Sequence, residues 1–248
     1  MEKIGLQLYS IKELAERNFL GTLKKVADIG YDGVEFAGYF NTPAREIKKV
    51  LDDSGIRAAG SHLGLEAILE DVGGTIAFSK ELESPYIVVP YLAPKYRDSA
   101  DAWKHTADTF NELGTKLKEN GLQLYYHNHD FEFEKFDGEF GLDILVNHTE
   151  PDNLHIELDT FWVEYMGLKS VDFMKKYGKR CSILHIKDMK SETEKINTII
   201  GRGVMNFPAI TALGKKLGVE WYTIEQEEFE TDLLFAVNEG YRYLSGIL

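Results

Sequence analysis

Eight short apolar segments recur along the chain, and each of the first seven is followed by a helix-patterned segment or a long loop. Dividing the 248 residues by eight gives units of about 31 residues, the size of a strand–helix repeat. Runs such as Ile87-Val88-Val89 indicate parallel strands that are covered on both faces. We predict an α/β fold with a last helix near 231–245 and strands near residues 4–9, 33–37, 56–61, 86–91, 122–128, 154–158, 182–187 and 220–225.

Two architectures fit this pattern, a closed (β/α)8 TIM barrel and an open doubly wound sheet. The open sheet normally carries a glycine-rich phosphate turn after its first strand, but Tyr9-Ser10-Ile11-Lys12 follows here. A barrel requires polar groups at the carboxyl ends of several strands. All eight segments end in such groups: Gln7 and Tyr9, Glu35, His62, Tyr91, His127 and His129, Asp159, His185 with Lys187 and Asp188, and Glu225 with Gln226. Since no linker divides the chain, we predict a single TIM barrel domain over residues 1–248.

Composition limits the classes of partner and compartment. The formal charge of −13 gives the molecule a field that repels phosphate backbones, which disfavours nucleic acid and anionic membranes. Cys181 is the single cysteine, so no intrachain disulfide can form. No signal-like segment precedes the first apolar run, and no run approaches the roughly 20 apolar residues of a membrane span. We expect a cytoplasmic protein.

Four strand ends carry side chains that could share one divalent metal ion. The fifth to eighth predicted strands end in or carry His127, Asp159, His185 and Glu225. Adjacent barrel strands lie about 4.8 Å apart, so inward side chains of four consecutive strands can converge on one ion. Two imidazoles and two carboxylates suit Mn²⁺, Co²⁺ or Zn²⁺ better than Ca²⁺ or Mg²⁺.

Simpler roles are open for each of these residues. A carboxylate at a strand end is often a helix cap or an ion-pair partner. His185 lies between Leu184 and Ile186 and could be a core histidine with satisfied hydrogen bonds. His129 competes with His127 for the ligand position on the fifth strand. The joint placement of four such residues at matched strand ends favours the metal site.

Short motifs also follow one another in a fixed order almost from end to end: Leu6-Gln-Leu-Tyr-Ser10, Ile29-Gly-Tyr-Asp-Gly-Val-Glu-Phe36, Gly60-Ser-His62, Tyr126-His-Asn-His-Asp-Phe-Glu-Phe133, Glu157-Leu-Asp159, Leu184-His-Ile-Lys-Asp188, Gly201-Arg-Gly-Val-Met-Asn-Phe207 and Ile224-Glu-Gln226. With these motifs the chain resembles the sugar phosphate isomerase/epimerase superfamily with the xylose isomerase-like TIM barrel, which is AP endonuclease family 2-like. The resemblance implies that Asp159, His185 and Glu225 are metal ligands. Members often pair, so a homodimer is a further expectation.

The chain departs from the superfamily pattern at three positions. Many members end the fifth strand in Glu-Asn-His, but here His127 takes the glutamate position, so one of the two glutamates of the ketose 3-epimerases is missing. Trp162 stands where those epimerases place a histidine. The His-rich fifth strand resembles inosose dehydratase-like members and the branch acting on 3-keto-glycosides, which eliminate a group β to a carbonyl. Arg202 separates two glycines that usually flank a glutamate, and could meet an acidic substrate group or a neighbouring carboxylate.

We therefore expect a metal-dependent sugar isomerase or epimerase that removes a proton beside a polarised carbonyl of a sugar or keto-sugar. Glu225, His129 or Glu132 would take the proton, and Lys187 would stabilise oxyanion charge. Glu35, His62, Trp162 and Arg202 would contact the substrate. The alternatives are a dehydratase or lyase of the inosose dehydratase or 3-keto-glycoside type and a non-catalytic sugar-binding barrel. The net charge of −13 argues against a DNA-repair endonuclease.

Overall fold

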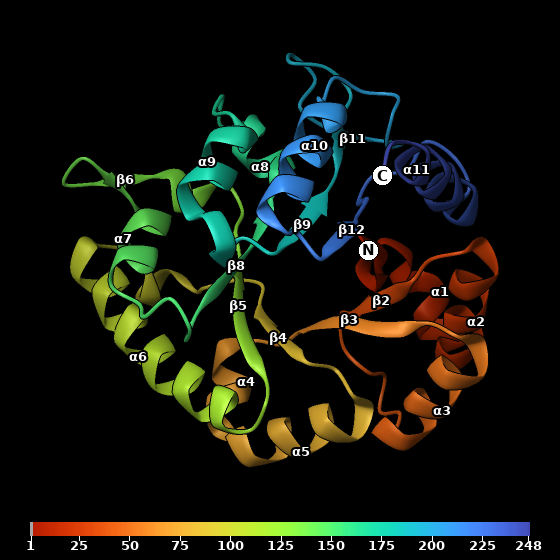
Figure 1. Cartoon of the computed structure of the whole chain (residues 1–248), viewed down its shortest axis with the longest axis horizontal. Coiled ribbons are helices and arrows are strands. Elements are labelled where there is room, and N and C mark those ends of the chain that lie inside the picture. Colours follow the sequence, from red (N-terminus) through yellow and green to blue (C-terminus); the bar gives the residue numbers. More distant parts are fainter. Residues whose placement is uncertain (1) are drawn as a thin grey trace.

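The eight predicted segments form parallel strands that close into a barrel (Figure 1). A computed structural model describes residues 2–248. Around the barrel the strands follow the order β1-β12-β9-β8-β5-β4-β3-β2. Their bounds are β1 Lys3–Gln7, β2 Gly33–Phe36, β3 Arg57–His62, β4 Tyr86–Val89, β5 Gln123–His127, β8 His155–Asp159, β9 Ile183–Ile186 and β12 Trp221–Ile224. The predicted single-domain TIM barrel is confirmed, and the open sheet is excluded.

Helices surround the barrel on its outside (Figure 1). The last helix packs against β1 and so covers the place where the first and last strands meet. No helix within residues 2–248 is both long and apolar enough to cross a membrane. The helices are α1 Lys12–Arg17, α2 Phe19–Ile29, α3 Ala44–Ser54, α4 Leu65–Glu70, α5 Val72–Leu82, α6 Ala100–Glu119, α7 Gly141–Asn147, α8 Thr160–Tyr165, α9 Ser170–Tyr177, α10 Phe207–Leu217 and α11 Leu233–Ile247.

Glycines end the helices that precede several strands. Gly30 after α2 has a φ of 114°, and Gly218 after α10 has a φ of 80°. Residues with a Cβ adopt this left-handed conformation only at a cost, so glycine turns the chain from the helix into the next strand cheaply. The succession of helix, glycine and strand at these two positions thus has a direct structural cause.

The interior of the barrel changes character from one end to the other. Near the amino ends of the strands, the lower interior cluster is apolar and consists of Ala59, Val88, Tyr125, Ile183 and Trp221. Alternate residues of a strand face the same side. The next inward residues after Tyr125 and Ile183 are therefore His127 and His185, at the carboxyl ends. The barrel thus places its buried polar side chains above an apolar floor.

The segment between β9 and α10 forms an anchored excursion at the carboxyl end of the barrel. It contains the short antiparallel strands β10 Asp188–Met189 and β11 Asn197–Thr198. A second such pair, β6 Lys135–Phe136 and β7 Glu139–Phe140, lies between β5 and α7. The buried Asp188 carboxylate accepts backbone hydrogen bonds from Met189, Gly201, Gly203 and Met205 at 2.8–3.2 Å. One side chain therefore fixes the path of the whole excursion.

Candidate metal centre

Four neighbouring strands deliver the predicted ligands to one place. His127 ends β5, Asp159 ends β8, His185 lies in β9, and Glu225 follows β12. The strand register sets Asp159 directly beside His185. All four side chains are buried, and each offers a ligand atom within 4.8 Å of the others. These distances are compatible with coordination of one ion, because ligands at about 2.0–2.2 Å from Zn²⁺ lie about 3–4 Å apart.

Asp159 caps a helix with one carboxylate oxygen and turns the other toward the ligand cluster. Its Oδ1 accepts hydrogen bonds from the backbone amides of Phe161 and Trp162 at 2.9 and 3.3 Å, so it caps α8. Its Oδ2 is buried, lies 3.8 Å from His127 Nε2, and faces the Lys187 ammonium at 3.1 Å. A buried carboxylate oxygen is costly unless a cation faces it. The donor set, in which this oxygen already faces a cation, fits a divalent metal ion.

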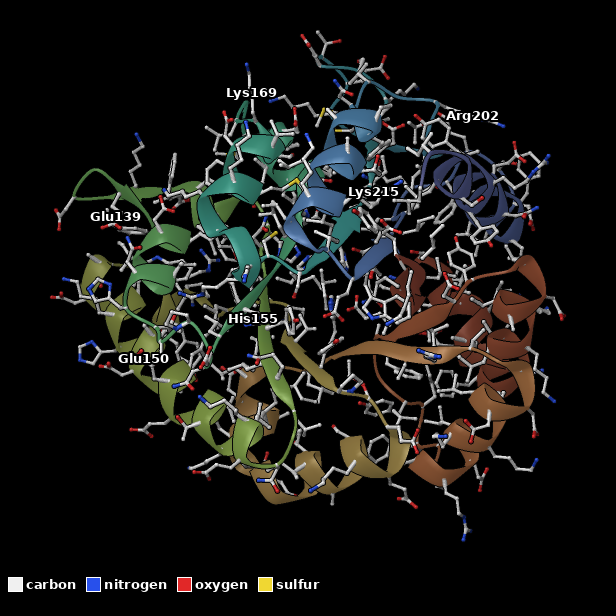
Figure 2. The ribbon with its side chains drawn as sticks, viewed as in Figure 1. Glu139, Glu150, His155, Lys169, Arg202 and Lys215 are labelled. Atoms are coloured by element: carbon white, nitrogen blue, oxygen red, sulfur yellow. The ribbon has the colours of Figure 1, made fainter. Side chains whose placement is uncertain are left out.

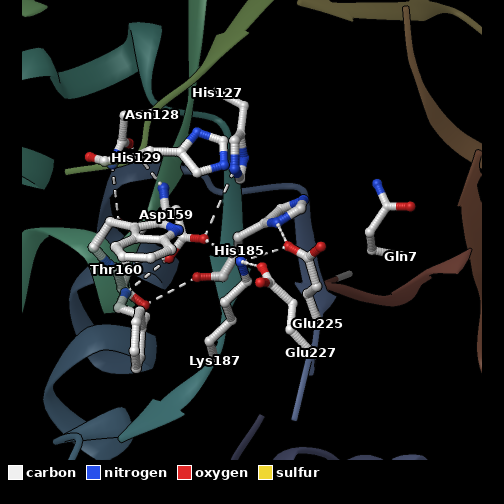
Figure 3. A network of polar contacts seen from close by, with 12 residues as sticks. Gln7, His127, Asn128, His129, Asp159, Thr160, His185, Lys187, Glu225 and Glu227 are labelled. Atoms are coloured by element: carbon white, nitrogen blue, oxygen red, sulfur yellow. Dashed lines mark hydrogen bonds and ion pairs between the residues drawn. The ribbon is translucent and has the colours of Figure 1, made fainter. Parts of the chain in front are cut away.

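Lys187 supplies positive charge at the same point (Figure 3). Its Nζ lies 3.1 Å from Asp159 Oδ2, 2.9 Å from Glu225 Oε2 and 2.6 Å from Glu227 Oε1. Burial alone would lower the pKa of Lys187, but these three carboxylates raise it well above its usual range. The ammonium group therefore stays charged and faces the two oxygens that would also face a metal ion.

A second layer of buried carboxylates lies around the histidines. Glu157 Oε1 lies 2.9 Å from His185 Nε2, 3.1 Å from His127 Nδ1 and 2.8 Å from His62 Nε2. Glu35 Oε2 lies 2.7 Å from His185 Nε2. Glu157 and Glu35 are fully buried. His62, His127, Glu157 and His185 form a second group that could hold a metal ion, but it shares both histidines with the first.

Protonation differs between the two candidate histidine ligands. Burial lowers the pKa of His127 well below its usual range, and the neighbouring His185 and His129 rings add to this effect. Burial alone would lower the pKa of His185 as well, but the carboxylates of Glu157 and Glu35 raise it well above its usual range. His127 is therefore a neutral ring, whereas His185 is positively charged until a cation replaces its proton.

A pocket of about 380 Å³ opens above the ligand cluster. Glu225 and His127 reach it from the ligand set, and Tyr9 and Tyr91 are large exposed aromatics at its mouth. This volume is in the range of small-molecule sites. Its full lining is Tyr9, Ala37, His62, Pro90, Tyr91, His127, His129, Glu225 and Glu227.

His129 faces this pocket beside the ligand cluster. Its ring centroid lies 5.0 Å from that of His127 and 5.6 Å from that of Trp162. Burial lowers the pKa of His129 to about 3, and its Nδ1 has no hydrogen-bond partner among residues 2–248. His129 is therefore a neutral ring, and a neutral imidazole that lines a pocket can accept a hydrogen bond from a bound molecule.

Glu132 and Arg202 belong neither to the ligand cluster nor to the pocket lining. Glu132 is fully buried, where it accepts hydrogen bonds from the Tyr126 hydroxyl at 2.5 Å and the His129 backbone amide at 2.8 Å. It therefore holds the turn that carries His129. Arg202 lies at the outer edge of the molecule, with Nη2 3.3 Å from Glu239 Oε2 of α11 (Figure 2). The Arg202 guanidinium therefore pairs with a neighbouring carboxylate and is not part of the pocket lining.

The remaining residues that were predicted to contact a substrate also differ in their distance from the pocket. His62 lines the pocket, and Trp162 lies beside it with Lys187 Nζ 5.7 Å from its ring centroid. Glu35 lies below, where it accepts a hydrogen bond from Gln7 Nε2 at 2.7 Å in addition to its contact with His185. The placement of Glu35 favours a role in holding His185 over contact with a substrate hydroxyl.

Sequence reasoning missed Glu157 and Glu227 as members of the site. Glu157 lies two residues before Asp159, and Glu227 lies two residues after Glu225. For Glu157 the period of two along a strand was a usable signal, because it places the side chain on the face that carries Asp159. Glu227 follows the end of β12, where no strand period applies.

Known proteins share both the sequence pattern and the fold. An inosose dehydratase of Clostridium beijerinckii is 24% identical over 250 residues, which cover 86% of this chain and 83% of that protein. A sugar phosphate isomerase/epimerase structure from Parabacteroides distasonis has a TM-score of 0.87 at 26% identity and covers 99% of this chain and 98% of its own. The IOLI protein, solved with a binding zinc atom, has a TM-score of 0.78 at 14% identity, covers 99% and 97% of the two chains, and shows the shared fold.

The family comparison extends over most of the chain. The family model described as xylose isomerase-like TIM barrel matches residues 23–245 of the 248. This span includes seven of the eight strands and all four candidate ligands. The chain belongs to the xylose isomerase-like TIM barrel family.

Proposed function

We propose that the protein is a metal-dependent lyase that eliminates a group β to the carbonyl of a keto-sugar or keto-polyol. The arrangement of carboxylates carries this proposal. His127 occupies the position of the second glutamate that a two-base epimerase needs, and Glu35, Glu132 and Glu157 are fully buried outside the pocket lining. Only Glu225 and Glu227 line the pocket as carboxylates, and both follow β12.

The proposed ligands are His127, Asp159, His185 and Glu225. The mixed nitrogen and oxygen donors and the buried Asp159 Oδ2 atom, which already faces a cation, support this assignment. The set suits Mn²⁺, Co²⁺ or Zn²⁺. When bound, such an ion acts as a Lewis acid toward a carbonyl oxygen.

The residues around this position would perform the proton transfers. The neutral ring of His129 takes the proton from the carbon beside the carbonyl. The electron pair of the broken C–H bond forms a C=C bond and the bond to the β-oxygen breaks. The leaving group takes the proton from the protonated His129 and departs as water or an alcohol. The Lys187 ammonium stabilises the negative charge that develops during this step.

The inosose dehydratase relatives support elimination, because the dehydration that their name prints is a β-elimination of this kind. A second candidate, an isomerase or epimerase, rests on the Parabacteroides distasonis protein of that name at 26% identity. The two candidates share the first proton abstraction and differ in the second step, which is loss of the β group in a lyase and return of the proton in an epimerase or isomerase.

An exchange and absorbance assay would separate the candidates. The protein, loaded with Mn²⁺, is incubated in deuterated water with an inosose and, separately, with a 3-keto-glucoside. Elimination yields a conjugated ketone that absorbs in the ultraviolet and a product that has lost water or an alcohol. Deuterium uptake without such loss would replace the lyase with an epimerase or isomerase. Neither signal with either substrate, in protein shown to hold metal, would favour a non-catalytic sugar-binding barrel.

A further inference from the structure

We propose that Glu157 is a positioning residue whose single oxygen Oε1 fixes the ring nitrogen that His127 and His185 each present to the metal position. This inference rests on the proposed metal-binding role of the two histidines. It assigns a function to a buried carboxylate that lines no pocket and caps no helix.

The contacts of Glu157 converge on one atom. Oε1 lies 3.1 Å from His127 Nδ1 and 2.9 Å from His185 Nε2, and both are hydrogen-bond distances. Glu157 is fully buried, so water does not compete for these contacts. The same oxygen lies 2.8 Å from His62 Nε2. A carboxylate accepts hydrogen bonds and, when ionised, donates none. With Glu157 ionised, each ring nitrogen that contacts Oε1 therefore carries a proton.

The opposite nitrogen of each ring then faces the metal position. His127 Nε2 lies 3.8 Å from Asp159 Oδ2, and His185 Nδ1 lies 2.9 Å from Glu225 Oε2. An imidazole ligates through its unprotonated nitrogen, and the hydrogen bond of the other nitrogen decides which one that is. One carboxylate thus sets opposite ring nitrogens, Nε2 in one histidine and Nδ1 in the other, toward the same point.

Glu157 is not equally important for the two histidines. His185 Nε2 has a second acceptor, because Glu35 Oε2 lies 2.7 Å away and is itself held by Gln7. Glu157 is the sole carboxylate within hydrogen-bond distance of His127 Nδ1 among the residues that the structure describes. His127 should therefore depend on Glu157 far more than His185 does.

The same argument separates His127 from His129. The ring of His129 has no carboxylate partner within the described chain, and its Nδ1 lacks any hydrogen bond. Aromatic neighbours pack against this ring, but no hydrogen bond sets which of its nitrogens is unprotonated. Glu157 therefore selects His127 as the fifth-strand ligand.

The first test uses the unaltered protein with ¹¹³Cd²⁺ alone as the probe. Long-range ¹H–¹⁵N spectra of the loaded protein identify the nitrogens that couple to cadmium. We expect coupling to His127 Nε2 and His185 Nδ1, with none to His129. Coupling to His127 Nδ1 or to His129 would overturn the inference. A protein that binds no Cd²⁺ at all would instead overturn the proposed metal-dependent function on which the inference rests.

The second test compares Glu157→Gln with Glu35→Gln. Gln keeps the size of the side chain but removes its charge and turns one terminal atom into a donor. In Glu157→Gln we expect Cd²⁺ affinity to fall about 10–100-fold, as for other residues that orient metal ligands. The metal-free variant should show His127 as a mixture of tautomers. In the cadmium-loaded variant, His185 should still bind through Nδ1. In Glu35→Gln the His127 tautomer should remain single.

A remote buried carboxylate provides the control. Asp143 is 5% exposed, and its carboxylate contacts Lys176 and Tyr177 instead of an imidazole of the site. Asp143→Asn should leave Cd²⁺ affinity and the His127 tautomer unchanged. Unchanged affinity and a single His127 tautomer in folded Glu157→Gln would refute the positioning role. If Glu157→Gln does not fold, the cadmium couplings in the unaltered protein still decide.

Discussion

The two halves of the barrel interior differ in chemistry although the same strands build both. In the lower interior cluster, Tyr125 and Ile183 pack with Trp221 as an apolar floor. Two residues further along β5 and β9, His127 and His185 meet buried carboxylates. On these two strands, a residue that packs in the apolar core and a residue of the polar site are therefore only two positions apart.

The difference has an energetic reason. Each buried charge loses several kcal/mol of hydration, which close partners only partly offset. The upper half contains Glu35, Glu157, Asp159, His185 and Lys187, all at most 1% exposed, in one network. Apolar burial in the lower half contributes in the opposite direction, since large aromatic side chains are the strongest single contributors to a core. We infer that substitutions in the two halves will separate cleanly into effects on metal and turnover and effects on folding.

The largest expected effect is the loss of metal and turnover in Asp159→Ala. Removing Oδ2 takes away a proposed ligand, and the loss of several kcal/mol of transition-state stabilisation lowers turnover by about 10³-fold or more. Elemental analysis and the elimination assay measure both quantities. Asp143→Asn serves as the buried control and should keep both. Full activity of Asp159→Ala, or of metal-stripped protein, would end the metal mechanism.

Trp221→Ala should have the reverse effect. The side chain is 2% exposed within the lower interior cluster, so its loss leaves a cavity that destabilises the protein by about 3–5 kcal/mol. Chemical denaturation gives this value. Metal affinity, measured on the folded protein, should stay within error of the unaltered chain. A large loss of metal affinity at intact stability would show that the two halves are not separable.

Lys187→Met should link stability to metal content. Without the ammonium group, Asp159 Oδ2 loses the cation that faces it and Glu225 keeps its contact with His185 alone, which destabilises the metal-free protein by about 3 kcal/mol. A bound divalent ion replaces this charge, so the loaded protein should lose much less. Thermal melting with and without Mn²⁺ measures the difference. The control is Lys176→Met, where Lys176 is half-exposed beside Asp143, and its effect should not depend on the ion.

His129→Ala and His127→Ala should separate base from ligand. His129→Ala should keep its metal and lose about 10²-fold in turnover, because it removes the proposed general base. His127→Ala should lose the metal. Metal content and elimination rate are measured on both variants. The opposite result would make His129 the ligand of the fifth strand.

The smallest effect concerns pH at the amino end of the barrel. Burial raises the pKa of the Cys181 thiol to about 12 from an ordinary value of 9.0. The unfolded chain ionises this thiol first, so the protein loses stability as pH rises from about 9 toward 12. Cys181→Ala should flatten that decline, as denaturation at about pH 8 and about pH 10.5, on either side of the ordinary thiol pKa, would show. An equal decline in both proteins would contradict the assignment.

Much of the fold was predictable because its signals are local. All eight strands overlap the predicted apolar segments, and the polar strand ends distinguished the barrel from an open sheet. A glycine marks the turn before β2, β3, β5 and β12. The convergence of His127, Asp159, His185 and Glu225 also follows from strand order alone. Their role as metal ligands remains a prediction.

The sequence did not predict how far each side chain lies below the mouth of the barrel. The ladder between β2 and β3 shifts register between Val34 and Glu35, so no simple alternation tells how far Glu35 lies below the mouth. Its contact with His185 spans 150 residues and arises only when the barrel closes. The pairing of Arg202 with Glu239 likewise depends on where α11 packs. Long-range closure, not local pattern, decides these contacts.

The Asp188 carboxylate that gathers four backbone amides has a consequence for how such an enzyme can diversify. Because these anchors are backbone groups, the exposed side chains from Glu192 to Ile196 can change while the path over the barrel is kept. Asn197, which accepts a hydrogen bond from the Glu227 amide, and the buried Ile199 and Ile200 are more constrained. Gly203 is constrained as well, since an added Cβ would collide with the Met189 carbonyl and with Asp188 itself. The exposed side chains at the rim can therefore change. Mutations at the mouth can alter substrate preference while the residues beneath it keep their positions.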